Sequence, residues 1–214
     1  MNVAVILSGC GVFDGAEINE TVLTLLALEE QGCDYTCFSL DKPQNHTINH
    51  HSGEMEETER NILEESARIV RGNIKSLSEI DVNDFSALIV PGGFGVAKNF
   101  SSIASDGKNF IIDPEIEKVL RSFSAAKKPV GYMCISPVLL PKFYHGVRCT
   151  IGNDLDTANI INELGGQHVD CAVEDIVIDE EHKVVSTPAY MLASNMVEAK
   201  RGIDKLVSAV IAMV

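Results

Sequence analysis

The 214-residue sequence predicts an α/β fold: a doubly wound three-layer sandwich with a mostly parallel central sheet. Segments typical of strands alternate with segments typical of helices, which is the pattern of βαβ units. The first strand segment is apolar on both faces, as expected for a central strand covered by helices on each side. No repeat, linker or low-complexity segment interrupts the chain, so we expect one domain over residues 1–214.

The chain begins with an expected strand from Asn2 to Ser8 and a glycine-rich turn from Ser8 to Gly15. This turn lacks the Gly-x-Gly-x-x-Gly spacing of dinucleotide-binding loops, so it does not predict nucleotide binding. A helix is expected from Glu17 to Glu30, followed by a strand from Tyr35 to Leu40. The residues expected to face the core from this helix recur at helical spacing, and they are Ile18, Val22, Leu25, Leu26 and Glu29.

Residues 41–72 form an expected insertion before the next central strand. Its polar first part, Asp41 to Gly53, holds His46, His50 and His51, and its second part, Glu54 to Arg71, has the periodicity of a helix. No acidic residue or cysteine stands at ligand spacing beside these histidines, so we favour solvated loop residues over a metal site. Because a connection of this length is often functional, we expect it to pack near the functional site or a dimer interface.

Of two predicted strands in the middle of the chain, one ends in a glycine-rich segment and the other ends at a cysteine. A strand from Phe85 to Val90 runs into Pro91-Gly92-Gly93-Phe94-Gly95, and Val96 to Asn99 opens a helical segment. Asp113-Pro114-Glu115 is typical of a helix start, and that helix is expected to end at Lys127-Lys128. A buried strand from Val130 to Met133, Cys134, and a short apolar helix from Ile135 to Leu140 follow.

The last part of the chain completes the alternation. We expect a strand from Val147 to Ile151, a helix from Asp156 to Leu164, and a hairpin of Asp175–Ile178 with Lys183–Ser186. The final helix has a continuous apolar stripe of Ile203, Leu206, Val207, Val210, Ile211 and Val214. This order of elements predicts a flavodoxin-like arrangement.

Cys134 stands at the predicted junction between a strand and a helix. Such a junction exposes the side chain and places the positive end of a helix behind it, and both features favour the reactive thiolate. A buried structural cysteine is the alternative, and it is the commoner role for this residue type. The carboxyl end of a strand in an α/β fold, where such folds build their sites, favours the functional role.

Composition excludes several classes of partner. The net charge of −14 disfavours nucleic acid and anionic membrane surfaces. No apolar run approaches the roughly 20 residues of a membrane span, and the N-terminus has no secretory pattern, so we expect a cytoplasmic protein. The six scattered cysteines fit a reducing compartment, and the Cys33-x3-Cys37 pair has no second ligand pair that would indicate zinc.

Five stretches together resemble a known family: residues 7–18, 90–95, 131–137, 150–154 and 186–191. They are similar to the PfpI superfamily, relatives of the class I glutamine amidotransferases, and more closely to its ElbB glyoxalase-like family. The resemblance implies a cysteine nucleophile, an acid on the first helix and backbone oxyanion donors. In relatives that process glyoxals, the cysteine adds to the aldehyde and a 2-hydroxy acid results, without glutathione, metal or another cofactor.

When the family's motifs are matched to this sequence residue by residue, the resemblance implies that Cys134 is the nucleophile and Glu20 the acid, with Glu17 as the alternative acid. The N–H groups of Gly93 and Ile135 take the oxyanion role. Further candidates for substrate binding are Gly92, Lys98, Asn99, Asn153 and Cys10. We also expect Cys10 to approach Cys134, since both follow inner strands at the same edge of the sheet.

The sequence departs from several relatives in its histidines. Amidotransferases have a histidine after the last strand, where this chain has Ser186-Thr187-Pro188-Ala189-Tyr190. Protease-like members have one directly after the cysteine, where Ile135 stands here, and some glyoxal-processing relatives have one where Gly152-Asn153 stands here. This argues against a glutaminase or a protease, and it leaves Cys134 and Glu20 to share one proton.

We therefore expect a weak glyoxalase-like enzyme that acts on a small aldehyde or dicarbonyl and works as a homodimer. A cysteine-based redox or stress-response protein is the alternative, because a reactive thiol beside a carboxylic acid also suits a peroxide sensor. A binding or assembly protein with a vestigial site is a third class, and the sequence leaves all three open.

Overall fold

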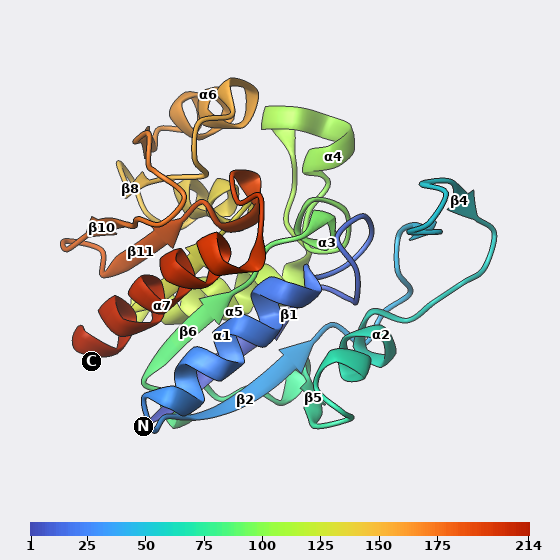
Figure 1. The fold of residues 1–214 in the computed structure, drawn as a ribbon, viewed down its shortest axis with the longest axis horizontal. Coiled ribbons are helices and arrows are strands. Elements are labelled where there is room, and N and C mark those ends of the chain that lie inside the picture. The colour runs from blue at the N-terminus through green and yellow to red at the C-terminus, as the bar shows by residue number, and fades with distance from the viewer.

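The computed structural model describes all residues, 1–214, and its centre is one seven-stranded sheet (Figure 1). The strand order is β10-β11-β7-β6-β1-β2-β5, and every neighbouring pair is parallel except the β10–β11 hairpin. This confirms the predicted α/β sandwich. The strands are β1 (Asn2–Leu7), β2 (Asp34–Ser39), β5 (Ile74–Ser76), β6 (Ala87–Val90), β7 (Val130–Met133), β10 (Val177–Asp179) and β11 (Val184–Thr187).

Both faces of the sheet are covered, so the strands contribute to two apolar cores. Along β1, Ala4 and Ile6 belong to one core, while Val3, Val5 and Leu7 belong to the other. This alternation follows from the two-residue period of a strand. One face is covered by α1 (Ile18–Glu30) and α7 (Met196–Ala212), which lie side by side, and α5 (Pro114–Ala125) packs on the opposite core (Figure 1).

The orientation of α1 differs from the prediction. Ile18, Val22 and Leu26 are 42%, 45% and 40% exposed, whereas the buried residues are Glu20, Thr21, Leu23, Thr24, Ala27 and Leu28. The stripe chosen from the sequence was wrong because the helix is apolar on most of its circumference, so periodicity alone does not select a face. Its polar inward residues are held by specific contacts, such as that of Thr24 Oγ1 with Met133 Sδ at 3.7 Å.

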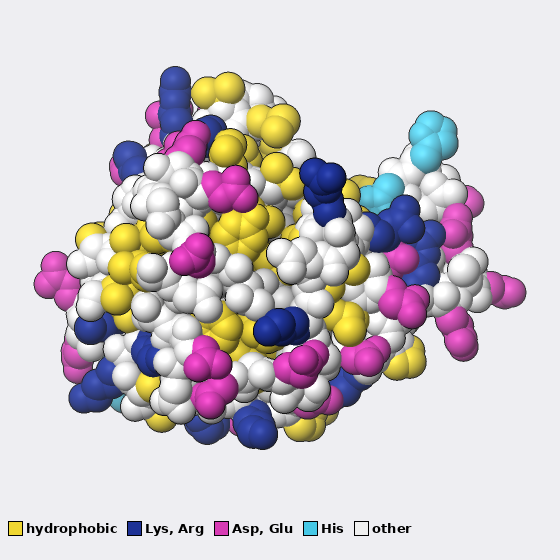
Figure 2. Space-filling view, turned by 90° about the horizontal axis from the view of Figure 1, so that it is seen from below, with side chains coloured by type: hydrophobic (Ala, Val, Ile, Leu, Met, Phe, Trp, Pro, Cys, Tyr) yellow, Lys and Arg dark blue, Asp and Glu magenta, His cyan; other side chains and the backbone are white.

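The insertion is less helical than predicted. It contains a small antiparallel pair, β3 (Thr47–Ile48) and β4 (Met55–Glu56), and a short helix, α2 (Ile62–Ile69). The expected helix from Glu54 is wrong in its first half because Asn61 caps α2, accepting a hydrogen bond from the N–H of Glu64 at 3.1 Å. The β3–β4 pair projects from the body of the molecule (Figure 1), and histidines stand out on this projection at the right of Figure 2.

The remaining elements connect these layers. The predicted strand at 147–151 is shorter, and it pairs with a neighbour outside the central sheet: β8 (Arg148–Cys149) is parallel to β9 (Gln167–His168). The short helix after Cys134 is a 3-10 helix, Ser136–Lys142, rather than an α-helix. Three further helices are α3 (Phe94–Lys98), α4 (Ile103–Asp106) and α6 (Leu155–Glu163). Four other 3-10 turns are Leu77–Glu79, Val82–Asp84, Gly107–Asn109 and Ala189–Met191.

Charged side chains of both signs are scattered over the face in Figure 2, with apolar side chains between them. No helix combines the length and the apolar character that crossing a bilayer requires. Nowhere do three or more His, Cys, Asp and Glu side chains group closely enough to hold a metal ion.

Candidate active site

Cys134 occupies a sharp turn between β7 and the following 3-10 helix. Its φ of 59° lies in the left-handed region, which costs a non-glycine residue roughly 1–2 kcal/mol. The turn is held in place because the Cys134 N–H donates to Thr187 O at 3.1 Å, and the buried Ser136 Oγ accepts from the Met133 N–H at 3.0 Å. The side chain is 7% exposed, so the sulfur sits below the surface rather than on it.

Glu20 lies in the first turn of α1 and is 0% exposed. Its Oε2 accepts from the Gly92 N–H at 2.8 Å, and its Oε1 accepts from the Tyr190 N–H at 3.1 Å. These donors follow β6 and β11, so the ends of two strands fix the carboxyl group. Glu17, the alternative acid, caps α1 instead, since its Oε2 accepts from the Glu20 N–H at 2.6 Å.

The structure places the sulfur of Cys134 beside the carboxyl group of Glu20, both against Gly92. The backbone N–H groups of Gly93 and Ile135 act to lower the pKa of this thiol. Gly92 permits the contact, because a Cβ atom there would lie 2.8 Å from Glu20 Oε2 and 2.9 Å from Cys134 Sγ. Five residues predicted from the sequence therefore meet at one point, and they are Glu20, Gly92, Gly93, Cys134 and Ile135.

Burial dominates the electrostatics of this pair. Desolvation, followed by the charge of Glu17, raises the pKa of Glu20 to about 7, against the lowering effect of its N–H donors. Desolvation, followed by the charge of Glu20, raises the pKa of the Cys134 thiol well above its usual value. Two such groups in contact hold one proton between them near neutral pH. The Glu20 carboxyl group accepts from two backbone N–H groups, and those of Gly93 and Ile135 favour the thiolate of Cys134, so the single negative charge is accommodated on either the sulfur or the carboxyl group.

The other candidates for substrate binding lie elsewhere. Lys98 Nζ donates to Phe13 O at 2.9 Å. Asn99 Nδ2 donates to the backbone oxygens of Ser8 and Asp14, which makes it a brace for the glycine-rich turn. Asn153 is exposed on the loop after β8. Their assignment to substrate binding stays a prediction.

Cys10 is partly buried, and its charged neighbours are Glu65, Arg68, Asp14 and Arg60. Desolvation, followed by the charge of Glu65, raises the pKa of its thiol. All six cysteines are free, so the structure contains no disulfide between Cys10 and Cys134. The environment of Cys10 belongs to α2 and the insertion, whereas that of Cys134 is set by Glu20.

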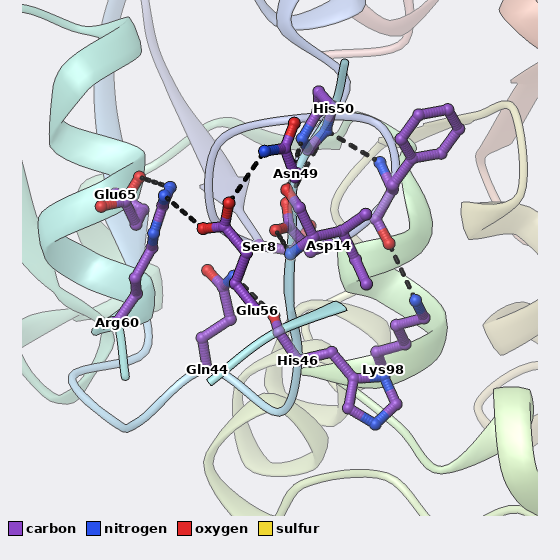
Figure 3. A network of polar contacts seen from close by, with 12 residues as sticks. Ser8, Asp14, Gln44, His46, Asn49, His50, Glu56, Arg60, Glu65 and Lys98 are labelled. Carbon is purple, nitrogen blue, oxygen red and sulfur yellow. Dashed lines mark hydrogen bonds and ion pairs between the residues drawn. The ribbon is translucent and has the colours of Figure 1, made fainter. Parts of the chain in front are cut away.

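The insertion docks on the glycine-rich turn that precedes α1 (Figure 3). The Phe13 N–H donates to His50 Nε2 at 3.2 Å, and the Ile48 N–H donates to Asp14 Oδ2 at 2.7 Å. The insertion also reaches α3, where Asn45 Nδ2 donates to Lys98 O at 3.0 Å. A surface cavity of about 350 Å³ lies at this junction, lined by Phe13, Ile48, Gly53, Phe94 and Lys98.

Sequence reasoning missed one participant, the backbone N–H of Tyr190. A main-chain donor leaves no side-chain signature, so no residue pattern pointed to it. The available signal was positional, because Thr187-Pro188-Ala189-Tyr190 leaves a strand next to the one that ends at Cys134.

Comparisons with known proteins agree with this geometry, although no family model matches the chain. The rat mitochondrial ES1 protein homolog is 42% identical over 219 residues, covering 98% of this chain and 82% of that protein. The human mitochondrial glutamine amidotransferase-like class 1 domain-containing protein 3 matches with the same identity and coverage.

Solved structures of other proteins have the same fold as this chain. An Ehrlichia chaffeensis isoprenoid biosynthesis protein with an amidotransferase-like domain superimposes with a TM-score of 0.93 and 40% identity, covering 100% of this chain and 99% of that one. Glyoxalase III from Candida albicans shares the fold at a TM-score of 0.64 and 14% identity, with 100% and 97% coverage. The chain therefore belongs to the ES1 family of class I glutamine amidotransferase-like proteins, an ElbB-like family, and it shares the fold of the DJ-1/PfpI proteins.

Proposed function

We propose that the protein is a glyoxalase-like enzyme that converts glyoxal to glycolate, with Cys134 as nucleophile and Glu20 as proton carrier. The observation that carries this proposal is the buried position of the Cys134 sulfur beside the Glu20 carboxyl group, which accepts from two backbone N–H groups. A nucleophile beside a group that titrates near neutral pH suits proton transfer during carbonyl addition. The pair needs no histidine for these steps.

In the first step, the Cys134 sulfur forms a bond to one aldehyde carbon, and the carbonyl oxygen becomes an oxyanion. We assign the stabilisation of this oxygen to the N–H groups of Gly93 and Ile135, which also act to lower the pKa of the Cys134 thiol. The proton that the pair shares then moves to the oxygen and leaves Glu20 as a carboxylate.

In the second step, Glu20 removes the hydrogen from the carbon bonded to sulfur, and the electron pair forms an enediolate with the second carbonyl. Glu20 returns this proton to the second carbon, while the hydroxyl proton of the first carbon moves to the oxygen of the second. The product is a glycolate thioester on Cys134, and no electron enters or leaves. Water hydrolyses the thioester, which releases glycolate and one proton and restores the pair. Acid–base steps of this kind contribute roughly 10²–10⁴-fold, so we expect modest turnover.

The test is glycolate formation from glyoxal by the wild type, Cys134→Ala, Glu20→Gln and the double variant. Cys134→Ala removes the nucleophile and abolishes turnover, while Glu20→Gln loses most of it and still reacts with iodoacetamide. Because the two residues act as a unit, the double variant is scarcely worse than Cys134→Ala. Cys171→Ala is the matched control, a free cysteine remote from the pair that leaves turnover unchanged. Full glycolate formation by Cys134→Ala overturns the proposal.

A second function is supported by the same contact. A sulfinate on Cys134 would accept from the N–H groups of Gly93 and Ile135 and from protonated Glu20. Two equivalents of hydrogen peroxide oxidise the thiolate to this state and are reduced to two equivalents of water. Stoichiometric gain of two oxygens on Cys134 at low peroxide, together with no glycolate from glyoxal, would favour the redox function over the enzyme.

We also propose that the protein is a homodimer. The outward face of α1, with Ile18, Val22 and Leu26 all at least 40% exposed, supports contact between two copies. Light scattering is expected to give twice the chain mass, and Val22→Glu is expected to halve it. Cytoplasmic location stays a prediction, and fractionation tests it, since both curated relatives are named as mitochondrial proteins.

A further inference from the structure

The turn after β11 contains a strained residue that points to a role in the site. Ala189 has a φ of 45° and is 0% exposed, so an alanine is held in the left-handed region inside the core. Such conformations cost free energy and persist only where surrounding contacts fix them. The next residue, Tyr190, directs its N–H at Glu20 Oε1, 3.1 Å away.

Hydrogen bonds fix the turn on both sides of Ala189. Ala189 O accepts from the N–H groups of Leu192 and Ala193 at 3.1 and 2.9 Å, and Thr187 Oγ1 donates to Asp175 O at 2.7 Å. Thr187 O also accepts from the Cys134 N–H at 3.1 Å. One turn therefore contacts both members of the pair: the backbone of Cys134 through Thr187, and the carboxyl group of Glu20 through Tyr190.

The Tyr190 side chain takes no part in the contact with Glu20. Its hydroxyl group accepts from Asn19 Nδ2 at 3.3 Å, on the residue just before Glu20. The contribution to the site therefore comes from the main chain, and it depends on the conformation of Ala189 rather than on the identity of residue 190.

We propose that the Ala189 turn is a positioning element that aims the Tyr190 amide at Glu20 and so keeps this carboxyl group able to release and regain a proton beside Cys134. The inference rests on the coupled pair of the proposed function, but not on any particular substrate. The groups that face Glu20 are Cys134 from the turn after β7 and Glu17 from the N-cap of α1, with backbone donors from Gly92 and Tyr190. Of these, only the Tyr190 donor is supplied by a strained turn.

The decisive variant replaces the amide at residue 190 with an ester, by incorporating the hydroxy-acid analogue of tyrosine. This change deletes one N–H and keeps the side chain. A hydrogen bond to a charged carboxylate is lost, so Glu20 ionises less readily, its charge raises the pKa of the Cys134 thiol less, and the midpoint of the pH profile of Cys134 alkylation by iodoacetamide is expected to fall by about one pH unit. Tyr190→Phe is the matched control. It keeps the amide, loses only the hydroxyl contact with Asn19, and leaves the midpoint in place.

A second pair of variants tests the turn itself. Ala189→Gly tolerates the left-handed conformation and is expected to leave the midpoint unchanged, whereas Ala189→Val cannot adopt it without strain and is expected to lower the midpoint. This pair decides the question if the ester protein does not fold. A merely structural turn would lower the melting temperature of Ala189→Val without moving its midpoint, and that result overturns the proposal.

The Glu20→Gln background separates this inference from the proposed function. The ester is expected to have no effect on the alkylation midpoint there, because the amide acts through Glu20, and an equal shift in both backgrounds overturns the proposal. Alkylation requires no glyoxal. A wild type that makes no glycolate but whose ester variant has a lowered midpoint therefore refutes the glyoxalase function and leaves the positioning role standing.

Discussion

Glu20 and Asp14 are both buried carboxylates near the start of α1, with exposures of 0% and 1%, yet their surroundings differ. Each oxygen of Glu20 accepts a backbone N–H, from Gly92 and Tyr190. Asp14 has one such partner, since Oδ2 accepts from the Ile48 N–H while Oδ1 has no hydrogen bond. His50 Nε2 lies 3.8 Å from that oxygen, but it already accepts from the Phe13 N–H (Figure 3).

The difference lies in where the partners come from. The donors to Glu20 follow two strands of the central sheet, so the whole fold holds them in place. The donor to Asp14 comes from β3, which is part of a projection from the body of the molecule. Both oxygens of Glu20 accept from donors that follow strands of the sheet, which suits repeated proton transfer. Only one oxygen of Asp14 is bonded, and that bond joins the glycine-rich turn to the insertion.

Adding a methyl group at Gly92 is expected to have the largest effect. The Cβ of Gly92→Ala would press on both Cys134 Sγ and Glu20 Oε2, which are fixed by the core, so we expect a loss of about 3–5 kcal/mol in unfolding free energy. Gly11→Ala is the counterpart at the junction, where the new atom would overlap the His50 ring of the insertion. Denaturant unfolding of the two variants compares their losses of stability. A Gly92→Ala protein as stable as the wild type would contradict a rigid arrangement of Cys134 and Glu20.

The pH dependence of stability is expected to report on Glu20. Folding raises the pKa of this carboxyl group from 4.5 to about 7, so the folded state favours the protonated form. The resulting stabilisation is complete below pH 4.5 and is lost as pH rises through 7, a change of about 3 kcal/mol. Glu20→Gln does not titrate, so its stability relative to the wild type is expected to rise by this amount between pH 4 and pH 8. Chemical denaturation of both proteins at pH 4 and pH 8 measures this difference in unfolding free energy. A difference that does not change with pH would show that Glu20 ionises normally.

Asp14→Asn is expected to stabilise the fold by about 1 kcal/mol at neutral pH. The substitution replaces a buried carboxylate that has only one hydrogen-bond partner by a neutral amide, whose oxygen keeps the Ile48 N–H. Urea unfolding measures the change, with Asp156→Asn on the exposed start of α6 as a control of equal charge. A large loss of stability would mean that the charge of Asp14 has a partner that the hydrogen-bond pattern does not reveal.

The smallest expected effect is that of His50→Ala. Loss of the ring removes the acceptor for the Phe13 N–H and the packing on the Phe13 ring, whose centroid lies 5.0 Å away. We expect faster hydrogen exchange in β3 and β4, a change in global stability within about 0.5 kcal/mol, and unchanged alkylation of Cys134. His51→Ala, in the same exposed turn, is the matched control. Altered Cys134 reactivity would instead tie the insertion to the pair.

The two regions also differ in how far the sequence predicted them. The Cys134–Glu20 centre was accessible because two of its signals are local, a strand that ends at a cysteine and a strand that ends in Gly92-Gly93, and because the family resemblance assigned the acid of the first helix to Glu20. The donor at Tyr190 was not accessible, since neither its N–H nor the left-handed Ala189 before it has a compositional signature.

Elsewhere the errors have specific physical causes. The face of α1 was misassigned because Glu20 and Thr24 point inward to polar and sulfur partners, leaving Val22 and Leu26 outside. The helix of the insertion was started too early because residues 54–61 carry helix-forming acids but pair as a strand and then cap α2. Such outcomes depend on contacts between distant segments, which override local propensity.

The two margins of the central sheet have a further consequence for association. Both outer strands, β5 and β10, are only three residues long, and β5 places the exposed Lys75 at its centre. A strand of this length presents few unpaired N–H and C=O groups, and a lysine resists the approach of another strand. The sheet therefore offers an extended chain little template for adding an eighth strand, so this protein is expected to resist edge-to-edge aggregation even at high concentration.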